Sequence, residues 1–253
     1  MINSRLIFSK ITDPFLNQAL EDILLNSVYN REFDLIIRFW FAEPSVIIGR
    51  NQSIKGEVNI KASQKYQIPI IRRITGGGAV YLDLGCLNFS FYLNNNCIFY
   101  TSNVSNLNRS FMQIIANALT LFNFDCLVQP PNSITIDGRK ISGSALIFKG
   151  NSVLHHGTLL VHTNLQKLTE LLNVEKKFRE IRYITSKKAD VTNVSFINQS
   201  ITIAEIIQKI IIQIEDAFQL KLTEKNLTES ELNQAKMMMR KQYLDLNWLN
   251  KIP

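Results

Sequence analysis

Residues 72–90 read RRITGGGAVYLDLGCLNFS, and this stretch decides the fold class. Two arginines lead into three successive glycines, which lose more backbone entropy on ordering than any other residue type. Such a segment persists where something approaches the main chain closely, so that its N–H groups, with Arg72 and Arg73 beside them, can face an anion or a carbonyl. The alternative is a flexible hairpin tip. The flanks favour the first interpretation, because residues 68–72 and 79–92 predict strands that hold the loop within a sheet.

Composition limits the classes of protein to which the chain can belong. Its 253 residues allow one large domain or two small ones, with a substantial core, and 46% hydrophobic with 19% charged residues is ordinary globular composition. No apolar run reaches membrane-spanning length, and residues 1–10 lack the long apolar centre of a signal peptide. Three cysteines without metal-ligand spacing predict a reduced, cytoplasmic protein with no disulfide framework and no membrane partner.

The net charge of +7 has several explanations. The basic residues are dispersed and show no aromatic–basic motif, so we expect no nucleic-acid partner. An acidic protein or an anionic small substrate fits the charge as well. The densest basic segment, which is either functional or a solvated surface, contains Lys176, Lys177, Arg179, Arg182, Lys187 and Lys188.

The first half of the chain predicts a helix followed by strands. Asp13 and Pro14 start a helix whose apolar face carries Glu21 on or beside it, and Glu21 taken alone is more commonly a surface residue. Residues 33–41 and 45–49 predict two strands paired with each other through a turn at 42–44. Gly49 to Gln52 is a polar end to an apolar strand, where sheet proteins often place ligand contacts. A short helix is expected over 59–66.

The second half continues the mixture. An amphipathic helix is predicted over 104–122, strands over 126–129, 132–136, 139–145 and 153–161, and a helix over 164–172. Capping boxes start helices after Thr202 and Thr228, whereas residues 243–253 contain no clear element. Strands and helices do not alternate strictly. We therefore expect one α+β domain with a mixed or largely antiparallel sheet.

Two short segments in this part of the chain carry candidate functional residues. Asp137-Gly138 is a strong hairpin turn, and it places Lys140 beside small residues, where a lysine can reach a phosphate or carboxylate or can simply lie on the surface. His155 and His156 are adjacent on one strand, so their side chains face opposite ways and cannot readily bind one metal ion together.

Six segments occur in order along nearly the whole chain: residues 17–22, 44–52, 72–90, 137–145, 155–160 and 191–193. Together they resemble the lipoate–protein ligase family, within the biotin/lipoate protein ligase superfamily. The segments RRITGGGAVY and KISGSA are the most specific. No Walker-type loop or Gly-x-Gly-x-x-Gly fingerprint competes with this assignment.

The resemblance implies a fold, a reaction and partners. The fold is a largely antiparallel sheet flanked by helices, as in the catalytic domain of these ligases. The reaction uses ATP, Mg²⁺ and lipoic acid to form lipoyl-AMP, and then transfers the lipoyl group to a lysine of a lipoyl carrier domain. The carriers implied are dehydrogenase-complex acyltransferase subunits and the glycine-cleavage carrier protein. Such carriers are typically acidic near the target lysine, which would explain the positive charge as encounter steering.

The resemblance also implies the site. Lys140 is the catalytic cation near the carboxylate and the α-phosphate, and the strand at 46–48 lines an apolar slot for the acyl tail. The residues implied to bind substrate or adenylate are Glu21, Arg72, Arg73, Thr75, Gly76, Gly77, Gly78, Asn88, Asn132, Ser142, Gly143, His156, Gly157 and Thr158. No metal ligand is assigned.

Three positions depart from the family pattern. Leu82 replaces the usual His, Cys86 the usual Asn, and Ser133 the usual Asp that would be a Mg²⁺ ligand. An ATP-independent lipoyl or octanoyl amidotransferase is therefore an alternative, with Cys126 as its nucleophile, although a free buried cysteine is the commoner case. A transfer-only enzyme and a non-catalytic lipoyl-domain-binding protein are further alternatives. We expect residues 1–253 to form a single catalytic domain without the C-terminal accessory domain of larger members, so that a separate activation protein could be needed.

Overall fold

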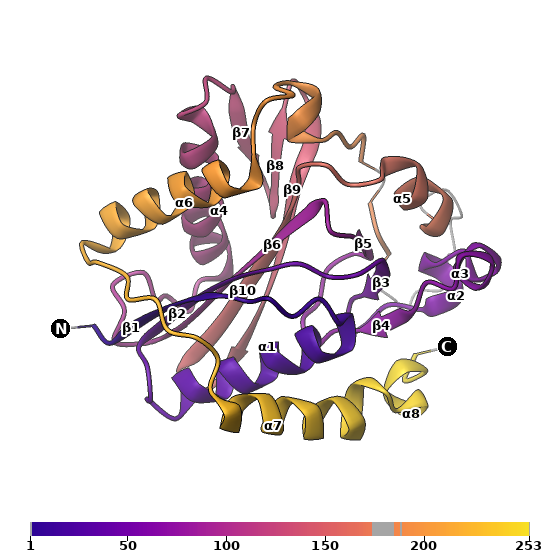
Figure 1. Ribbon diagram of the computed structural model, residues 1–253, viewed down its shortest axis with the longest axis horizontal. Helices are drawn as coiled ribbons and strands as arrows, with labels where there is room; N and C mark the ends of the chain where they lie inside the picture. Colours follow the sequence, from indigo (N-terminus) through magenta and orange to yellow (C-terminus); the bar gives the residue numbers. More distant parts are fainter. Residues whose placement is uncertain (1, 174–184, 188, 253) are drawn as a thin grey trace.

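The computed structural model describes residues 2–173, 185–187 and 189–252, and within them two sheets are flanked by helices (Figure 1). The larger sheet has seven described strands in the order β1-β2-β6-β10-β9-β8-β7. These strands are β1 (Ser4–Phe8), β2 (Leu35–Trp40), β6 (Cys86–Asn94), β7 (Cys126–Gln129), β8 (Ser133–Ile136), β9 (Arg139–Lys149) and β10 (Ser152–Leu160). Among the described strands of this sheet, only β1 and β2 pair in parallel, which confirms the predicted largely antiparallel sheet.

A smaller sheet lies beside the large one and carries the strand before the glycines. Its order is β4-β3-β5, with β3 (Ser45–Ile48) between β4 (Ile70–Arg72) and β5 (Val80–Leu82). The three glycines connect β4 to β5, so both ends of the loop are fixed by pairing to the same central strand. The predicted strands at 68–72 and 79–92 are thereby confirmed.

Helices cover the two faces of the large sheet (Figure 1). One face, which we call the α1 face, packs against α1 (Pro14–Tyr29), and α7 (Glu229–Met238) packs against α1 in turn. The other, the α4 face, packs against α4 (Val104–Thr120), which α6 (Ile203–Phe218) contacts. The shorter α-helices are α2 (Ile54–Glu57), α3 (Ile60–Tyr66), α5 (Leu165–Leu171) and α8 (Leu246–Leu249). A 3₁₀ helix covers Val194–Phe196, and a π-helix covers Met239–Tyr243.

Local sequence explains where the helices begin. The Asp13 carboxylate accepts hydrogen bonds from the N–H groups of Phe15 and Leu16, with Pro14 in the first turn. Thr202 and Thr228 each form the expected reciprocal capping box, with Glu205 and Glu231. No helix in the described ranges is both long and apolar enough to cross a membrane.

One predicted pairing is wrong. Residues 33–41 and 45–49 form strands β2 and β3, but these belong to different sheets. The physical reason is that both edges of β2 are already occupied, by β6 on one side and by β1 on the other. Strand β1 lies in a segment from which we expected no strand. The C-terminal residues, where no element was expected, contain α8.

Strand alternation separates two apolar cores. On β6, Phe89 and Phe91 enter the cluster on the α4 face, whereas Tyr92 enters the cluster on the α1 face with Leu20 and Trp40. Because of this alternation, Ser90 faces the same way as Tyr92. The α1 face therefore carries polar groups inside an otherwise apolar layer, next to the glycine loop.

Candidate active site

The glycine loop, residues 73–78, is organised by the arginine at its start. The side chain of Arg73 donates to the carbonyl oxygens of Gly76 at 3.0 Å and Gly78 at 2.8 Å, and to Thr75 Oγ1 at 2.9 Å. Its guanidinium also reaches Ile47 O at 3.3 Å. Burial lowers the pKa of Arg73 to about 10. Arg73 was expected to bind substrate or adenylate, but its donors are directed to the carbonyls of its own loop.

Close backbone approach explains Gly49, and backbone conformation explains Gly77. A Cβ on Gly49 would lie 2.2 Å from Gly77 O, so β3 and the loop can touch only without a side chain there. Gly77 has φ +84°, which side chains disfavour, and a Cβ on it would lie 3.5 Å from Ala145 Cβ on β9. The loop therefore lies directly over β9 at Ala145.

Three consecutive main-chain donors of the loop have no acceptor in the part of the chain that the structure describes. Among the described residues, no acceptor is recorded for the N–H groups of Gly76, Gly77 and Gly78. The next N–H, of Ala79, donates to Ser186 Oγ at 2.9 Å. Successive free N–H groups in a turn form a concavity that suits an anion.

A β-bulge brings the Lys140 side chain to the face of β9 that carries Gly143 and Ala145. Thr135 of β8 pairs with Lys140 and Ile134 pairs with Ser142, so Ile141 is the extra residue. The Lys140 side chain consequently lies over Gly143, where a Cβ would meet its Cε and Nζ at 3.0 Å. Gly143 and Ala145 are two residues apart, a separation of about 7 Å along a strand. Lys140 and Gly77 thus lie side by side over neighbouring small residues.

Lys140 is poised to meet an anion. Its side chain is half-buried, and burial lowers the pKa of the ammonium group. In the part of the chain that the structure describes, no hydrogen-bond acceptor or acidic partner is recorded for Nζ. A partly desolvated cation without a counter-ion favours a negatively charged ligand beside it. Lys140 is therefore not the freely solvated hairpin lysine of the alternative interpretation.

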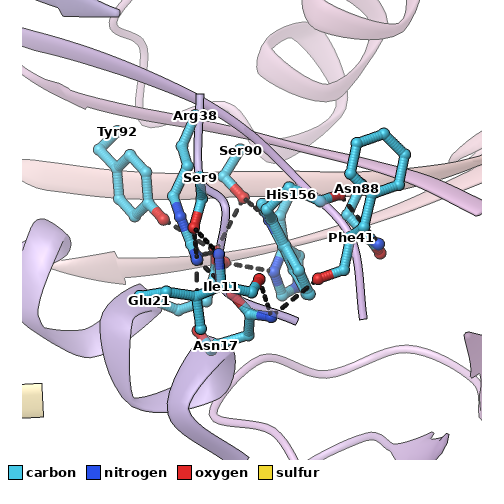
Figure 2. Close-up of polar contacts among 11 residues, drawn as sticks. Ser9, Ile11, Asn17, Glu21, Arg38, Phe41, Asn88, Ser90, Tyr92 and His156 are labelled. Carbon is cyan, nitrogen blue, oxygen red and sulfur yellow. Dashed lines mark hydrogen bonds and ion pairs between the residues drawn. The ribbon is translucent and has the colours of Figure 1, made fainter. Parts of the chain in front are cut away.

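Glu21 lies at the centre of a buried polar network beneath the loop (Figure 2). Its Oε2 is 2.7 Å from His156 Nδ1, and its Oε1 accepts from Ser90 Oγ and Tyr92 Oη, each at 2.8 Å. Arg38 Nη1 lies 3.4 Å from the same Oε1. Glu21 is fully buried, so the surface position that is commoner for a lone glutamate does not apply to it.

The network keeps Glu21 ionised. Burial would raise the pKa of its carboxyl group, but the hydrogen bond from His156, the charge of Arg38 and the hydrogen bond from Tyr92 together hold it below its usual value. His156 extends the network to the glycine loop, because its Nε2 lies 2.8 Å from Thr75 Oγ1.

Arg72 does not face this site. Its guanidinium donates to Leu249 O at 2.8 and 3.0 Å and to Ile252 O at 3.1 Å. It also donates to the carbonyl oxygens of Gly49, Arg50 and Gln52. Consecutive strand residues point to opposite sides, so Arg72 fixes the C-terminal segment while Arg73 fixes the loop.

The other expected residues divide between the two faces of the sheet. Thr158 pairs with Gly143 and with Asn88, and all three lie on the face that carries His156. Gly157 lies on the opposite face, where a Cβ would be 2.4 Å from the ring of Phe89, so its smallness serves packing.

Two further expected residues are committed to the protein or left without a partner. The Asn132 amide donates to Ser144 O, and Ser144 N donates back to Asn132 O at 3.0 Å. The Ser142 hydroxyl is buried and has no partner among the described residues. Of the strand at 46–48, expected to line an acyl slot, only Ile47 joins the α1-face cluster, whereas Val46 and Ile48 face the small-sheet cluster.

Sequence reasoning missed several contributors. Arg38 is one, and its signal was present: it is a charged residue within the apolar strand LIIRFW. A second group lies at the other end of the loop, where Ser186 Oγ donates to the buried Glu57 carboxylate and accepts from Gln52 Nε2 at 3.1 Å. Gln52 ends the polar segment that was singled out for ligand contacts. Most of the basic segment, Lys176 to Arg182 and Lys188, lies outside the described residues.

The family model of the lipoyl protein ligase A/B catalytic domain matches residues 13–215, which contain the glycine loop, Lys140 and His156. This chain belongs to that family. The ligase family assignment confirms the resemblance drawn from the six sequence segments.

Relatives of the family agree with this assignment. Lipoate-protein ligase LplJ of Bacillus subtilis is 30% identical over 240 residues, which are 94% of this chain and 70% of LplJ. Lipoate–protein ligase 1 of Staphylococcus aureus is 32% identical over 222 residues, 86% of this chain and 66% of the relative. The chain thus spans about two thirds of the length of these ligases.

Solved ligase structures share the fold along nearly the whole chain. A bi-partite lipoate protein ligase from Thermoplasma acidophilum, described with its E2 lipoyl domain, superposes with a TM-score of 0.83 at 27% identity, covering 98% of this chain and 96% of that one. A lipoate-protein ligase A bound with ATP gives a TM-score of 0.82 at 27% identity, covering 98% of both chains.

The residues present fit the anionic groups of this family's substrates. The N–H groups of the glycine loop and the ammonium of Lys140, which have no acceptor among the described residues, can together donate hydrogen bonds to a carboxylate and a phosphate. For Mg²⁺ the described residues provide no group of three or more His, Cys, Asp or Glu side chains that could hold a metal ion. We therefore assign no metal ligand.

Cys126 is the nucleophile in the amidotransferase alternative, and its surroundings disfavour reaction of its thiol. It lies half-buried on the outermost strand β7 and packs against the α4-face core. Burial, with the nearby charge of Asp125, raises the pKa of its thiol to about 12. A thiol with so high a pKa is rarely ionised at neutral pH and is a poor nucleophile.

Proposed function

We propose that this protein is a lipoate–protein ligase that activates lipoate with ATP to lipoyl-AMP and transfers the lipoyl group to a lysine of a lipoyl carrier domain. The observation that carries the proposal is the half-buried ammonium of Lys140, unpaired in the described residues, beside the free N–H groups of the glycine loop. The names of the relatives and the ATP-bound and lipoate-bound family structures support the same reaction.

In the first step a carboxylate oxygen of lipoate attacks the α-phosphorus of ATP, and the bond to pyrophosphate breaks. Negative charge builds up on the α-phosphate oxygens. Lys140 holds the carboxylate for attack, and the N–H groups of the loop stabilise the phosphate charge. Mg²⁺ accompanies ATP in this proposal and supplies charge neutralisation at its phosphates.

In the second step the neutral ε-amine of the carrier lysine attacks the carbonyl carbon of lipoyl-AMP. The amide bond forms, AMP leaves, and the amine loses a proton. Lys140 stabilises the oxyanion that forms on the carbonyl or the leaving phosphate, because both lie within the reach of one ammonium group. The acyl tail lies in the apolar layer of the α1 face, against Ile47.

The partners in this proposal are lipoyl carrier domains of the kinds expected from the sequence. Support comes from the Thermoplasma ligase described with its E2 lipoyl domain. The positive charge of the chain, +7, would speed encounter with an acidic carrier. A cytoplasmic location and a single catalytic domain belong to the same proposal, and the bi-partite architecture of the Thermoplasma relative keeps a separate activation protein within it.

The test supplies three donors to a purified lipoyl domain and measures its mass. The donors are lipoate with ATP–Mg²⁺, preformed lipoyl-AMP, and a second lipoylated protein, and the control is a carrier with its target lysine replaced by arginine. We expect modification from the first two donors. Modification from lipoyl-AMP alone would mean that activation requires a partner, and modification from the lipoylated protein alone would replace the ligase by an amidotransferase. No modification from any donor would leave a lipoyl-domain-binding protein.

A further inference from the structure

An unbroken chain of polar contacts links β2 to the carbonyl groups of the glycine loop. Arg38 on β2 approaches Glu21 on α1, and Glu21 approaches His156 on β10. His156 contacts Thr75 at 2.8 Å, and Thr75 contacts Arg73, whose guanidinium holds the carbonyls of Gly76 and Gly78. The proposed activation step uses only the glycine loop, which lies at one end of this series of contacts. The remaining groups therefore need an explanation of their own.

Glu21 cannot contact a ligand while these bonds persist. Its Oε1 is approached by three donors, from Ser90, Tyr92 and Arg38, and its Oε2 faces His156 Nδ1 (Figure 2). The carboxylate is fully buried and ionised, so it only accepts hydrogen bonds. His156 must therefore carry a proton on Nδ1.

The other end of the His156 ring then has a defined role. Arg73 Nε can only donate, so it donates to Thr75 Oγ1 at 2.9 Å. The Thr75 hydroxyl proton needs an acceptor, and among the described residues the acceptor within reach is His156 Nε2 at 2.8 Å. An unprotonated Nε2 gives the Thr75 hydroxyl its acceptor and agrees with the donors and acceptors of Glu21, His156 and Arg73.

We propose that Arg38, Glu21 and His156 form a positioning relay for the glycine loop. The buried ion pair fixes the Nδ1–H tautomer of His156, which commits the Thr75 hydroxyl proton to His156 Nε2. Thr75 Oγ1 then accepts from Arg73, and Arg73 in turn holds the loop carbonyls so that the glycine N–H groups point away from them. Thr75 consequently does not donate its hydroxyl proton to the substrate.

His155 provides an internal reference for this tautomer. Its Nε2 lies 2.7 Å from Asn108 Oδ1, a carbonyl oxygen that can only accept, and its Nδ1 is buried without a partner in the described residues. His155 is therefore the Nε2–H tautomer. Two consecutive histidines of one strand are expected to carry their protons on opposite nitrogens.

Long-range ¹H–¹⁵N NMR of the purified protein at neutral pH tests the relay directly, since the chain contains only three histidines. The expected spectrum shows a protonated Nδ1 and an unprotonated Nε2 for His156, and the reverse for His155. A doubly protonated His156, or an Nε2–H tautomer, would overturn the proposal. This measurement requires no substrate, so its failure differs from failure of the proposed ligase activity.

Glu21→Gln tests the first link. In the wild type, Arg38 Nη1 donates to Glu21 Oε1. In the variant, the side-chain oxygen of the glutamine should therefore face Arg38, and its amide nitrogen should face His156 Nδ1. The expected result is a switch of His156 to the Nε2–H tautomer, with His155 unchanged. The control Glu32→Gln makes the same chemical change at an exposed residue and should leave both tautomers as they are. Retention of the Nδ1–H tautomer in Glu21→Gln would contradict the relay.

Thr75→Val tests the last link, with Thr75→Ser as the matched variant that keeps the hydroxyl. Valine has the shape of threonine but cannot accept from Arg73. We expect the backbone ¹H–¹⁵N order parameters of Gly76–Gly78 to fall from about 0.85 to below about 0.6 in Thr75→Val. Adenylate formation should slow by about tenfold, as is typical when a supporting partner is lost. Thr75→Ser should keep the order parameters near about 0.85 and the rate of adenylate formation within about threefold.

The kinetic part rests on the proposed function, whereas the order-parameter measurement does not. Unchanged order parameters at Gly76–Gly78 in Thr75→Val would show that the loop does not depend on Thr75 and would overturn the relay. Lower order parameters with an unchanged rate of adenylate formation would overturn its link to catalysis.

Discussion

His155 and His156 are consecutive residues of β10, and they lie on opposite faces of the large sheet. On the α4 face, His155 packs against the rings of Phe91 and Phe111, and burial lowers its pKa to about 3, so it is neutral. On the α1 face, His156 contacts the ionised Glu21, which Arg38 approaches from the other side. The α4 face buries its polar group uncharged, whereas the α1 face buries charges that balance one another.

The difference between the faces follows their roles. An uncharged hydrogen-bonded group costs little to bury, so the α4 face can serve as the packed core. Buried charges must be paired, and removing one partner is costly. Their presence on the α1 face coincides with the glycine loop and Lys140, where a fixed arrangement of donors favours anion binding. The variants described next each change a residue on one of the two faces, and activity or stability is measured.

The largest effect is expected for Lys140→Ala. The variant lacks the ammonium group that we propose to stabilise both the α-phosphate and the oxyanion of the transfer step, so lipoylation should fall by on the order of 10³-fold. The measurement is the initial rate of mass change of the lipoyl domain. Lys149→Ala, at an exposed lysine of the same strand, should keep the wild-type rate. Near wild-type activity of Lys140→Ala would show that our catalytic assignment is wrong.

The next effect concerns stability. Arg38→Leu leaves the buried Glu21 without its cationic partner, which should lower the free energy of unfolding by about 3–5 kcal/mol. Urea unfolding measures this loss. On the α4 face, Asn108→Ala leaves neutral partners unsatisfied, including Ser144 Oγ at 2.7 Å, and should cost only about 1–3 kcal/mol.

The double variant Arg38→Leu with Glu21→Gln is the control for the charge argument. It removes both charges, so it should be more stable than Arg38→Leu alone. If the single and double variants are equally unstable, loss of packing rather than an unpaired charge explains the effect.

A third prediction is a pH dependence from the α4 face. The pKa of His155 is lowered from 6.5 to about 3 on folding, so below pH 6.5 the unfolded chain binds a proton that the folded protein does not. The stability that the neutral His155 contributes is fully present above pH 6.5 and is lost as the pH falls toward about 3. Between pH 6 and pH 5, His155→Phe should therefore lose less unfolding free energy than the wild type, by up to about 1.4 kcal/mol per pH unit.

Only the difference between the two proteins tests this prediction. Burial raises the pKa of Asp22 to about 6, so Asp22 changes stability in the opposite direction as the pH falls through 6. Asp22 is present in both proteins, and its contribution cancels in the comparison. Equal pH dependence of wild type and variant would contradict a neutral, buried His155.

The smallest effect is expected for Cys126→Ser, on the α4 side of the outer strand. A ligase does not use this thiol, so the lipoylation rate should stay within about twofold, and stability should change by about 0.5 kcal/mol or less. The assay is again the mass of the carrier. Loss of activity in this variant with retained folding would favour the cysteine-dependent amidotransferase.

Much of the secondary structure could be predicted from local sequence. The helix expected over 104–122 is α4 (Val104–Thr120), and the turn at Asp137-Gly138 has positive φ at both residues. These features depend on neighbours within a few positions, which periodicity and capping describe well. The pairing of β2 with β3 was wrong, because strand partners depend on which edges distant segments such as β1 already occupy.

The site was predicted in part. The glycine loop and Lys140 were recognised, but Arg72 and Arg73 were expected to act alike. Their opposite directions place Arg72 on the carbonyls of the C-terminal segment and Arg73 on those of the loop. Arg38 was missed, although a charge within an apolar strand was a usable signal. Its partner Glu21 is seventeen positions away on α1, so only packing of the helix on the sheet brings them together.

The sequence by itself determined the helices, the turns, the glycine loop and the family, because each depends on residue types at short or fixed spacing. The tertiary structure decided which face each side chain serves. A single extra residue in β9 turns Lys140 toward the loop, and strand alternation sends His155 into an apolar core and His156 to a buried charge. Such outcomes depend on register and on contacts between distant segments, which no local pattern specifies.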